Sequence, residues 1–369
     1  MEIPLFVEEE VLTSESVSPK PSRSAASLII VNYNGRGYLE RCLQSLFRSL
    51  QAGDQVILVD NASADGSADG LEERYPDIEV LRSPKNLGFA AGCNLGASLA
   101  RGEYLVFLNP DTVVEPGWLE PLVAALQSDP WIGLATPKIL LLAQPDRINT
   151  AGNDIHLTGL TLCRGAGLDR GALSEPAELS AVSGAAFIIR RQLFEALGGF
   201  DPDFFMYMED TDLSWRARLS GYRCLYVPDS LVYHDYTLRF RPNKTFYQER
   251  NRYQMLLKNL RWRSLLVLFP ALLLAELVTW GFVITKEPLQ WRDKLKAYAW
   301  VCTHWGKIME KRKNTQALRA AKDADLLRHH TTHLDFEQTG DSLVTKGAHY
   351  IFNPLYYLLF HLVISLLDD

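Results

Sequence analysis

Short apolar runs alternate with amphipathic segments along the first 110 residues of the chain. Each run is continuous, which is typical of strands buried on both faces of a parallel sheet. The predicted strands are Ser27–Val31, Gln55–Asp60, Ile78–Ser83 and Tyr104–Leu108, and the predicted helices between them are Tyr38–Leu50 and Gly88–Gly102. This alternation predicts an α/β fold with a mostly parallel sheet that is covered by helices on both faces.

The pattern is less regular after the fourth predicted strand. Pro121–Ser180 has no clear period, whereas Gly184–Arg191 and Cys224–Asp235 again read as strands. His234 lies at the end of the second of these. A lone histidine there is usually structural, and it becomes a metal ligand only if it faces a carboxylate, because mixed His/Asp ligation suits Mn²⁺.

Three polar clusters follow predicted strands. They are Asn32–Asn34, Asp60–Ser63 and Asn109–Asp111. Ligands of parallel sheets gather beyond the carboxyl ends of the strands, so these clusters are expected on one rim. Each also has the composition of an ordinary turn, which is the simpler interpretation of any one of them.

Asp111 is the most informative of these residues. Asn109 precedes a proline and is therefore held extended, which makes the turn before Asp111 stiff. A carboxylate at this place suits Mg²⁺ or Mn²⁺, both of which prefer oxygen ligands. Asp60, in the same kind of position, is suited to accept hydrogen bonds from a nucleobase or a ribose.

The most acidic local feature is the segment EDTDL. Its Glu209, Asp210 and Asp212 crowd the expected start of a helix, where the dipole favours negative charge. Capping uses one or two carboxylates, so the third indicates a further role. Partial burial beside like charges raises the pKa of a carboxylate and suits it to general-base work.

Two long apolar blocks lie near the C-terminus, at Ser264–Ile284 and Tyr350–Leu367. The first would span roughly 31 Å as a helix, about one hydrocarbon thickness. Pro270 and Glu276 interrupt it, and basic residues flank it on both sides. These flanks favour a re-entrant or interfacial helix attracted to anionic lipid over a single pass. The alternative is a pair of core helices in a soluble bundle.

Composition limits the remaining classes. The chain has 369 residues and a net charge of −6, so no nucleic-acid partner is expected. Its five cysteines are scattered without a CxxC pair, which indicates reduced thiols in a cytosolic setting. Residues 1–25 are rich in Glu, Ser and Pro and lack the features of a signal peptide, so a flexible tail is predicted there.

The order of the motifs resembles the family 2 inverting glycosyltransferases of the GT-A fold, in particular their rhamnosyltransferase-like branch. The resemblance covers about Ser27 to Asn259. It is carried by SLIIVNYNG, VILVDNASADGS, NLGFAAGCNLGA, YLVFLNPDT, SGAAFIIRR, GGFDPDFFMYMEDTDLSWRARLSGYR and VYHDY. Arg250 and Asn251, in ERNRY, match a further signature to which no role is assigned. The resemblance implies a Rossmann-like mixed sheet with helices on both faces.

The resemblance also implies a donor site. Asp60 would bind the nucleotide base, with Asn32 and Asn34 in the loop beside it. Asn86 and Asn94 fall in the segment that lines the donor site.

Metal-binding and catalytic residues follow from the same resemblance. Asn109 and Asp111 occupy the position of the family's Asp-x-Asp motif, with Asn in place of the first acid. Asp111 would hold a divalent ion, Mg²⁺ or Mn²⁺, at the diphosphate, and His234 matches the late histidine ligand of some members. Asp210 would be the catalytic base, with Glu209 beside it.

The expected function is transfer of a sugar from a nucleotide donor to a glycan or polyprenyl-diphosphate-linked acceptor in bacterial cell-surface polysaccharide synthesis. The resemblance favours dTDP-rhamnose as donor, and UDP-glucose, UDP-N-acetylglucosamine and UDP-galactofuranose are the alternatives. A dinucleotide-dependent oxidoreductase is disfavoured because VNYNGRG supplies no GxGxxG turn. A catalytically silent nucleotide-sugar-binding scaffold of the same fold is the other alternative.

The predicted organisation has three parts: a tail at 1–25, a catalytic domain at 26–235 and a helical membrane-associating region at 236–369. Within the catalytic domain, 26–120 would bind the nucleotide-sugar, and 121–235 would bind the acceptor and carry the base. The protein is expected in the cytoplasm, peripheral or re-entrant at the inner face of the cell membrane. Homo-oligomerisation is left open.

Overall fold

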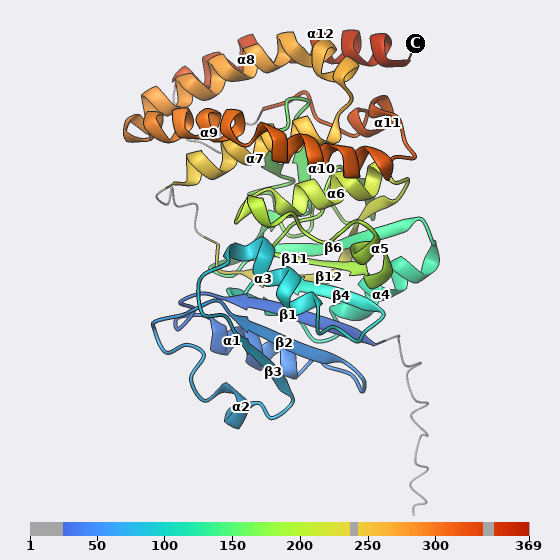
Figure 1. Cartoon of the computed structure of the whole chain (residues 1–369). Helices are drawn as coiled ribbons and strands as arrows, with labels where there is room; N and C mark the ends of the chain where they lie inside the picture. The colour runs from blue at the N-terminus through green and yellow to red at the C-terminus, as the bar shows by residue number, and fades with distance from the viewer. Residues whose placement is uncertain (1–24, 237–242, 335–342, 369) are drawn as a thin grey trace, which may run out of the picture.

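The computed structural model describes residues 25–236, 243–334 and 343–368, and a mixed sheet forms its middle layer (Figure 1). The strands of this sheet are β1 (Ala26–Asn32), β2 (Gln55–Asp60), β3 (Ile78–Arg82), β4 (Tyr104–Leu108), β5 (Thr112–Val114), β6 (Ile132–Leu141), β7 (Gln144–Thr150), β10 (Ala177–Leu179), β11 (Ala186–Arg190) and β12 (Arg223–His234). A separate pair consists of β8 (Asn153–Ile155) and β9 (Thr161–Cys163).

Helices cover the sheet and form the C-terminal part of the molecule. They are α1 (Leu39–Phe47), α2 (Leu71–Arg74), α3 (Gly88–Ala97), α4 (Leu119–Ser128), α5 (Arg191–Ala196), α6 (Glu209–Leu219), α7 (Lys244–Asn259), α8 (Trp262–Lys286), α9 (Trp291–Thr303), α10 (Trp305–Ala317), α11 (Asp323–Leu327) and α12 (Leu343–Asp368). Two short 3-10 turns are η1 (Pro202–Phe204) and η2 (Pro288–Gln290).

The predicted strands all belong to this sheet, and β3 is its edge strand. The strand order is β10-β12-β6-β11-β4-β1-β2-β3. Strand β1 lies parallel to both β2 and β4, and β2 lies parallel to β3. Strand β11 runs antiparallel to β4 and β6, so the sheet is mixed. The carboxyl ends of β1, β2 and β4 therefore share one rim, as predicted.

The long strand β6 lies in the region where no clear period was found. Its partner β12 changes register between Val227, opposite Pro137, and Leu231, opposite Lys138. Proline has no N–H to give to the ladder, and the bulge in β12 absorbs this loss. Pro137 and Lys138 interrupt the apolar pattern of this strand, so the sequence did not predict it. Lys138 is nevertheless buried, and its Nζ donates to the Arg170 carbonyl at 2.8 Å.

Both faces of the sheet are buried, which explains the continuous apolar runs. Along β1, Leu28 and Ile30 pack into a core with α1 and α4, whereas Ile29 and Val31 pack into a second core with α3, α6 and α7. Because both faces are covered, residues pointing to either face are apolar, and the strands show no alternation of polar and apolar positions. The prediction of helices on both faces is confirmed.

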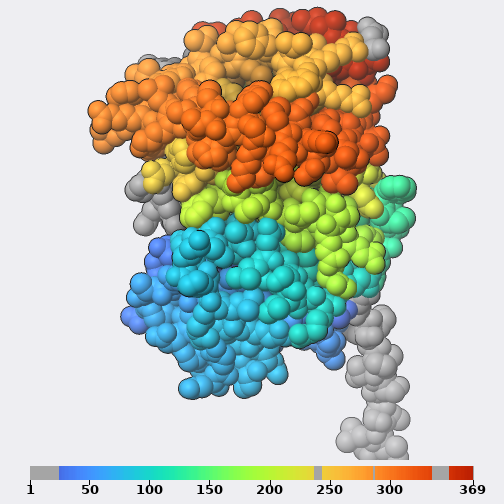
Figure 2. All heavy atoms as spheres, viewed as in Figure 1, coloured from blue at the N-terminus to red at the C-terminus, as the bar shows by residue number. Residues whose placement is uncertain are grey.

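The C-terminal helices form a separate layer on the α6 side. Helices α8 and α12 lie side by side at the end of the molecule farthest from β1, β2 and β3 (Figure 1). In the space-filling view, the orange and red atoms of this layer cover one end of the molecule (Figure 2). Helix α8 extends the predicted apolar block by two residues at each end, and α12 contains the second block.

The basic residues around α8 are only partly available to a lipid surface. Arg252, Lys258 and Lys294 are fully buried in ion pairs, whereas Arg261 and Arg292 are exposed. The predicted attraction of the basic flanks to anionic lipid stays a prediction, and it concerns only the exposed cations. Burying these cations against carboxylates removes the cost of leaving either charge unpaired.

The predicted domain limits remain predictions. Strand β1 begins at Ala26 and β12 ends at His234. The predicted tail at 1–25 lies outside the described residues except for Ala25. All five cysteines lie within the described residues and are free thiols, which agrees with the absence of a disulfide pattern.

Candidate active site

One polar cluster joins the ends of β1 and β2. Asn32 and Asp60 are partners in the register of the two strands. Asn32 is buried, and its Nδ2 donates to Ser67 Oγ at 2.8 Å and to Ser63 Oγ at 3.1 Å. Asp60 Oδ1 accepts from the Ser63 N–H at 3.2 Å. Asn32 thus holds the loop that follows β2, and Asp60 lies on the rim beneath it.

Asn34 lies on the exposed outer side of the same cluster. Its φ is 56°, a left-handed conformation that asparagine tolerates better than most residues. Its Oδ1 accepts from the Ala64 N–H at 2.8 Å, and its own N–H donates to Ser63 Oγ at 3.0 Å. Asn34 therefore fastens the loop after β1 to the loop after β2.

Asn86 closes the turn that leads into α3. Its Oδ1 accepts from the Gly88 N–H at 2.8 Å and from Asn61 Nδ2 at 3.1 Å. Asn61, which was not predicted as a site residue, also accepts from the Leu87 N–H at 2.8 Å. Its position directly after Asp60 was the available signal. The amide pair connects the loop after β2 to the start of α3.

Asn94 connects α3 to the segment before the acidic helix. Its Nδ2 donates to the Phe200 carbonyl at 2.8 Å, and its Oδ1 accepts from the Phe200 N–H at 2.9 Å. Both polar atoms of the amide are engaged by this backbone. A direct contact between Asn94 and a donor stays a prediction.

Asp111 lies in a tight turn after β4. The Asn109 carbonyl accepts from the Thr112 N–H at 3.3 Å and from Thr112 Oγ1 at 2.7 Å. The turn interpretation is therefore correct for the backbone. It leaves the Asp111 carboxylate free for another use, because no hydrogen-bond partner of its buried Oδ1 occurs among the described residues.

Pairing between β5 and β12 brings His234 beside this turn. His234 lies opposite Thr112 in that register, and the Asp235 N–H donates to the Asp111 carbonyl at 2.9 Å. His234 Nε2 is 3.2 Å from Asp111 Oδ1. The histidine and the carboxylate therefore face each other.

The tautomer of His234 is set by Asn149. His234 Nδ1 is 2.9 Å from Asn149 Oδ1, and an amide oxygen only accepts, so Nδ1 carries the hydrogen. In the neutral ring, Nε2 then presents a lone pair to the Asp111 carboxylate. Two facing acceptors favour a cation between them, and a nitrogen–oxygen pair suits Mn²⁺.

This arrangement fits a divalent ion, although it supplies only part of a coordination shell. In the described parts of the chain, no group of three or more His, Cys, Asp or Glu side chains is placed to hold an ion. Asp111 and His234 would therefore be two ligands, and substrate phosphate and water would supply the others.

The acidic pair lies at the start of α6. Asp210 Oδ2 accepts from the Gly184 N–H at 2.7 Å and from Asn153 Nδ2 at 3.1 Å. Its Oδ1 accepts from the Thr211 N–H at 2.7 Å. Glu209 is as deeply buried, but its Oε2 has no hydrogen-bond partner among the described residues.

These surroundings give the two carboxylates different proton affinities. Burial, and then repulsion by Asp210, raises the pKa of Glu209 to about 8. Burial also raises the pKa of Asp210, but the donors from Thr211 and Gly184 oppose the shift. Two adjacent buried carboxylates do not both ionise readily, so Asp210 is the one that keeps the charge near neutral pH.

Asp212, the third acid of the segment, has a structural role. Its carboxylate accepts from Arg216 Nε at 2.9 Å, from Lys258 Nζ and from Asn259 Nδ2 at 3.0 Å. Burial would raise the pKa of Asp212, yet the Lys258 and Arg216 cations bring it below the ordinary value. The acid fixes α6 against α7, and no chemistry need be assigned to it.

A single short segment joins the two halves of the site. The Asn109 N–H donates to the Ala185 carbonyl at 2.9 Å, and the neighbouring Gly184 N–H donates to Asp210 Oδ2. A Cβ at Gly184 would lie 3.0 Å from that oxygen, so glycine permits the close approach. Residues 184–185 therefore set the spacing between the Asp111 turn and Asp210.

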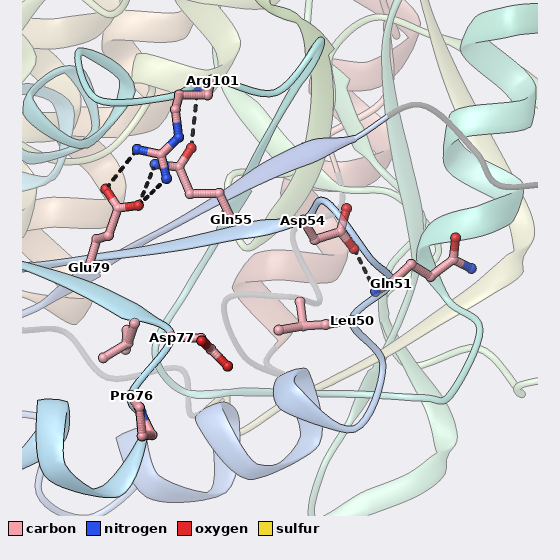
Figure 3. A pocket seen from close by; sticks show the side chains of 9 residues that line it. Leu50, Gln51, Asp54, Gln55, Pro76, Asp77, Glu79 and Arg101 are labelled. Carbon is pink, nitrogen blue, oxygen red and sulfur yellow. Dashed lines mark hydrogen bonds and ion pairs between the residues drawn. The ribbon is translucent and has the colours of Figure 1, made fainter.

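A separate hollow of about 480 Å³ lies at the other end of the sheet (Figure 3). Three of its charged side chains are used within the fold: Glu79 pairs with Arg101 and accepts from Gln55, and Asp54 accepts from the Gln51 N–H. The hollow borders the amino end of β2, so it lies away from the carboxyl-end rim that carries the polar clusters.

This chain is similar to several proteins that are named as glycosyltransferases. Residues 27–198 match the family described as glycosyl transferase family 2. An N-acetylglucosaminyl-diphospho-decaprenol L-rhamnosyltransferase of Mycobacterium tuberculosis is 29% identical over 232 residues, covering 56% of this chain and 75% of that protein. A pre-mycofactocin glycosyltransferase of the same species is 31% identical over 235 residues, covering 62% of this chain and 47% of that protein.

Two solved structures share the fold. A crystal structure of GalNAc-T7 with UDP, GalNAc and Mn²⁺ has a TM-score of 0.56 at 23% identity, covering 64% of this chain and 48% of that one. The crystal structure of S. aureus TarS 1–349 has a TM-score of 0.54 at 15% identity, covering 93% of this chain and 88% of that one. The mixed sheet and its helices are thus a GT-A fold. Residues 27–198 of the chain are a glycosyl transferase family 2 domain.

Proposed function

We propose that this protein is an inverting transferase that moves rhamnose from dTDP-rhamnose to a polyprenyl-diphosphate-linked acceptor. The observation that carries the proposal is the segment 184–185, which holds Asp210 and the Asp111 turn at a fixed spacing. Asp210 is suited to accept a proton from the acceptor hydroxyl, and the Asp111 carboxylate would face the leaving phosphate. Such fixed spacing is what a displacement reaction requires.

Asp210 is the proposed base. An acceptor hydroxyl is a poor nucleophile near neutral pH, so Asp210 takes its proton as the oxygen attacks the anomeric carbon. The new carbon–oxygen bond forms as the bond to the nucleoside diphosphate breaks, and the proton later passes from Asp210 to water. A single displacement inverts the anomeric centre and needs no covalent nucleophile.

The donor side is assigned to the loops at the ends of β1, β2 and β4. Asp60 accepts from the nucleobase, beside the loop that Asn32 and Asn34 fasten. Asp111 and His234 would hold the divalent ion. When bound, such an ion neutralises charge on the departing diphosphate.

The choice of sugar and acceptor rests on the mycobacterial relative named above. That relative's name gives rhamnose as the sugar and N-acetylglucosaminyl-diphospho-decaprenol as the acceptor. TarS has been solved with UDP-GlcNAc, so a UDP-sugar is the alternative donor to compare. An acceptor of this kind is embedded in a membrane by its polyprenyl chain.

The C-terminal layer supports attachment to that membrane. The outward face of α8 is apolar, with Leu266, Phe269, Leu273, Leu277 and Ile284 exposed. The outward face of α12 exposes Tyr350, Ile351, Leu355, Leu358 and Leu362. Both helices are long and apolar enough to cross a membrane, and only a small part of each apolar stretch is buried. The soluble-bundle alternative would leave these faces against water.

The inward face of α8 argues against a span surrounded by lipid. Glu276 Oε2 is 3.2 Å from Lys294 Nζ, and Glu276 Oε1 pairs with Arg252. Tyr253 and Tyr298 donate their hydroxyls to the same carboxylate. Opening this cluster to lipid would expose charged groups at a high cost. We therefore infer that α8 and α12 lie flat in one leaflet, with exposed Arg261 and Arg292 near anionic headgroups.

The reaction is tested with purified full-length protein, Mn²⁺ and N-acetylglucosaminyl-diphospho-polyprenol. Transfer is expected from dTDP-rhamnose, with inversion shown by NMR of the product. UDP-glucose, UDP-N-acetylglucosamine and UDP-galactofuranose are run in parallel. Turnover of one of these instead would correct the donor. Nucleotide binding without turnover of any donor would favour the scaffold alternative.

The attachment is tested with the double variant Leu273→Glu, Leu277→Glu. Its sedimentation with phosphatidylcholine–phosphatidylglycerol vesicles should fall by at least about 10-fold, because two leucines leave the lipid and two charges would have to enter it. The control is Leu99→Glu, Leu168→Glu, which changes two exposed leucines of the catalytic domain. Equal loss in the control, or dissociation of a soluble dimer by the α8 variant, would contradict the lipid assignment.

A further inference from the structure

The loop before the acidic pair has an unusual backbone. Phe205, Tyr207 and Met208 have φ values of 62°, 69° and 66°. Residues with side chains rarely adopt this region, and such strain persists only where the surroundings enforce it. Glu209 and Asp210 follow at once, so whatever holds this loop also sets the first turn of α6.

Arg250, on α7, holds the start of the loop. Its Nη2 donates to the Asp203 carbonyl at 2.5 Å and to the Phe204 carbonyl at 2.7 Å. The guanidinium lies over the rings of Tyr247 and Trp300, at 5.0 and 4.8 Å from their centroids. Burial lowers the pKa of Arg250 to about 10, so the group stays charged near neutral pH.

Asn251, the next residue of α7, holds the rest of the loop. Its Nδ2 donates to the carbonyls of Phe204 at 3.0 Å, Met206 at 2.9 Å and Tyr207 at 2.7 Å. Its Oδ1 accepts from Arg250 Nε at 2.9 Å. That contact turns the amide so that its N–H groups face the loop, and the two side chains therefore act as one unit.

The remaining carbonyl of the loop reaches the donor side. The Phe205 carbonyl accepts from the Phe89 N–H at 2.6 Å and from the Ala90 N–H at 3.3 Å. A Cβ at Gly88 would lie 2.5 Å from Phe205, so this approach depends on glycine. With these bonds, each carbonyl from residue 203 to residue 207 is held from outside the loop.

We infer that Arg250 and Asn251 are positioning residues that set Asp210 relative to the donor segment at the start of α3. The inference rests on the proposed transfer reaction. It assigns a structural role to Arg250 and Asn251 of ERNRY, the family signature to which the sequence assigned none. It also makes α7 a part of the catalytic centre, whereas the sequence had placed this helix in the membrane-associating region.

The test uses full-length Asn251→Ala and Arg250→Lys in detergent, with transfer kinetics and hydrogen exchange of residues 203–210. Asn251→Ala should lower kcat by about 10–100-fold, because a displaced base loses the geometry of attack. The donor KM should stay within about threefold, since the donor contacts are kept. Exchange in 203–210 should accelerate, while exchange in α12 should not change.

Gln254→Ala is the matched control, because Gln254 is a buried polar residue one turn along α7 with no hydrogen-bond partner among the described residues. It should leave kcat and loop exchange near the wild-type values. Equal losses in the control, or an unchanged loop exchange in both variants, would overturn the inference. Should Asn251→Ala fail to fold, Arg250→Lys decides, because it keeps the charge and loses the planar fork. Hydrogen exchange needs no turnover, so it tests the loop separately from the proposed reaction.

Discussion

The Asp210→Asn variant is expected to lose sugar transfer by about 10²–10⁴-fold, the usual contribution of a general base. Asparagine keeps the shape of the side chain but takes up no proton. Its amide oxygen still accepts from the Gly184 N–H, so the fold should persist. Nucleotide donor affinity, measured by calorimetry, should change little. Unchanged turnover would remove Asp210 as the base.

Glu209→Gln is the matched control for this prediction. Because burial and Asp210 raise the pKa of Glu209 to about 8, the acid is mostly protonated at pH 7, and glutamine mimics that neutral form. The variant should therefore keep most of its transfer at pH 7 and differ from the wild type mainly above pH 8, where Glu209 ionises. A loss in Glu209→Gln as large as in Asp210→Asn would move the base to Glu209.

The acid side of the wild-type rate profile checks the same assignment. Burial raises the pKa of Asp210, so transfer should fall as the pH drops through a value above that of an ordinary aspartate. Protonation removes the acceptor for the hydroxyl proton. In Asp210→Asn, the residual rate should not show this titration.

The centre of the fold was predictable because its strands are buried on both faces. Along β1 and β4, every residue is buried, so the apolar runs report the sheet directly. Strand β6 escaped prediction because Pro137 and Lys138 interrupt its pattern. The bulge in β12 and the hydrogen bonds of the Lys138 ammonium compensate for both, and these are tertiary effects that a local pattern does not carry.

The residue types of the candidate site were predictable, but their partners were not. The short strand β5 pairs with the end of β12, and this pairing brings His234 to Asp111. Asn149, which sets the histidine tautomer, comes from the region without a clear period, and Gly184, which approaches Asp210, lies at the start of a predicted strand. Their functions depend on the register of distant strands, so no local signal marked them.

Asp111→Ala is expected to lower transfer in Mn²⁺ by about 100-fold or more, since a metal at the leaving group stabilises developing charge by several kcal/mol. In EDTA the variant and the wild type should be nearly equal, because neither then has the ion. Mn²⁺ binding with nucleoside diphosphate present, followed by electron paramagnetic resonance, should weaken in parallel. This second measurement does not depend on turnover.

The variant Asn149→Ala tests whether Asp111 is a metal ligand or only a structural residue of the turn. Without the Asn149 oxygen, His234 is free to carry its hydrogen on Nε2, which removes the lone pair facing Asp111. Mn²⁺ affinity should then fall by about 10-fold, although the Asp111 turn itself is untouched. If Asp111→Ala is equally impaired in Mn²⁺ and EDTA, and Asn149→Ala binds Mn²⁺ normally, the carboxylate is a turn residue. Loss of Mn²⁺ affinity in both variants would instead show that the histidine and the aspartate act on the same ion.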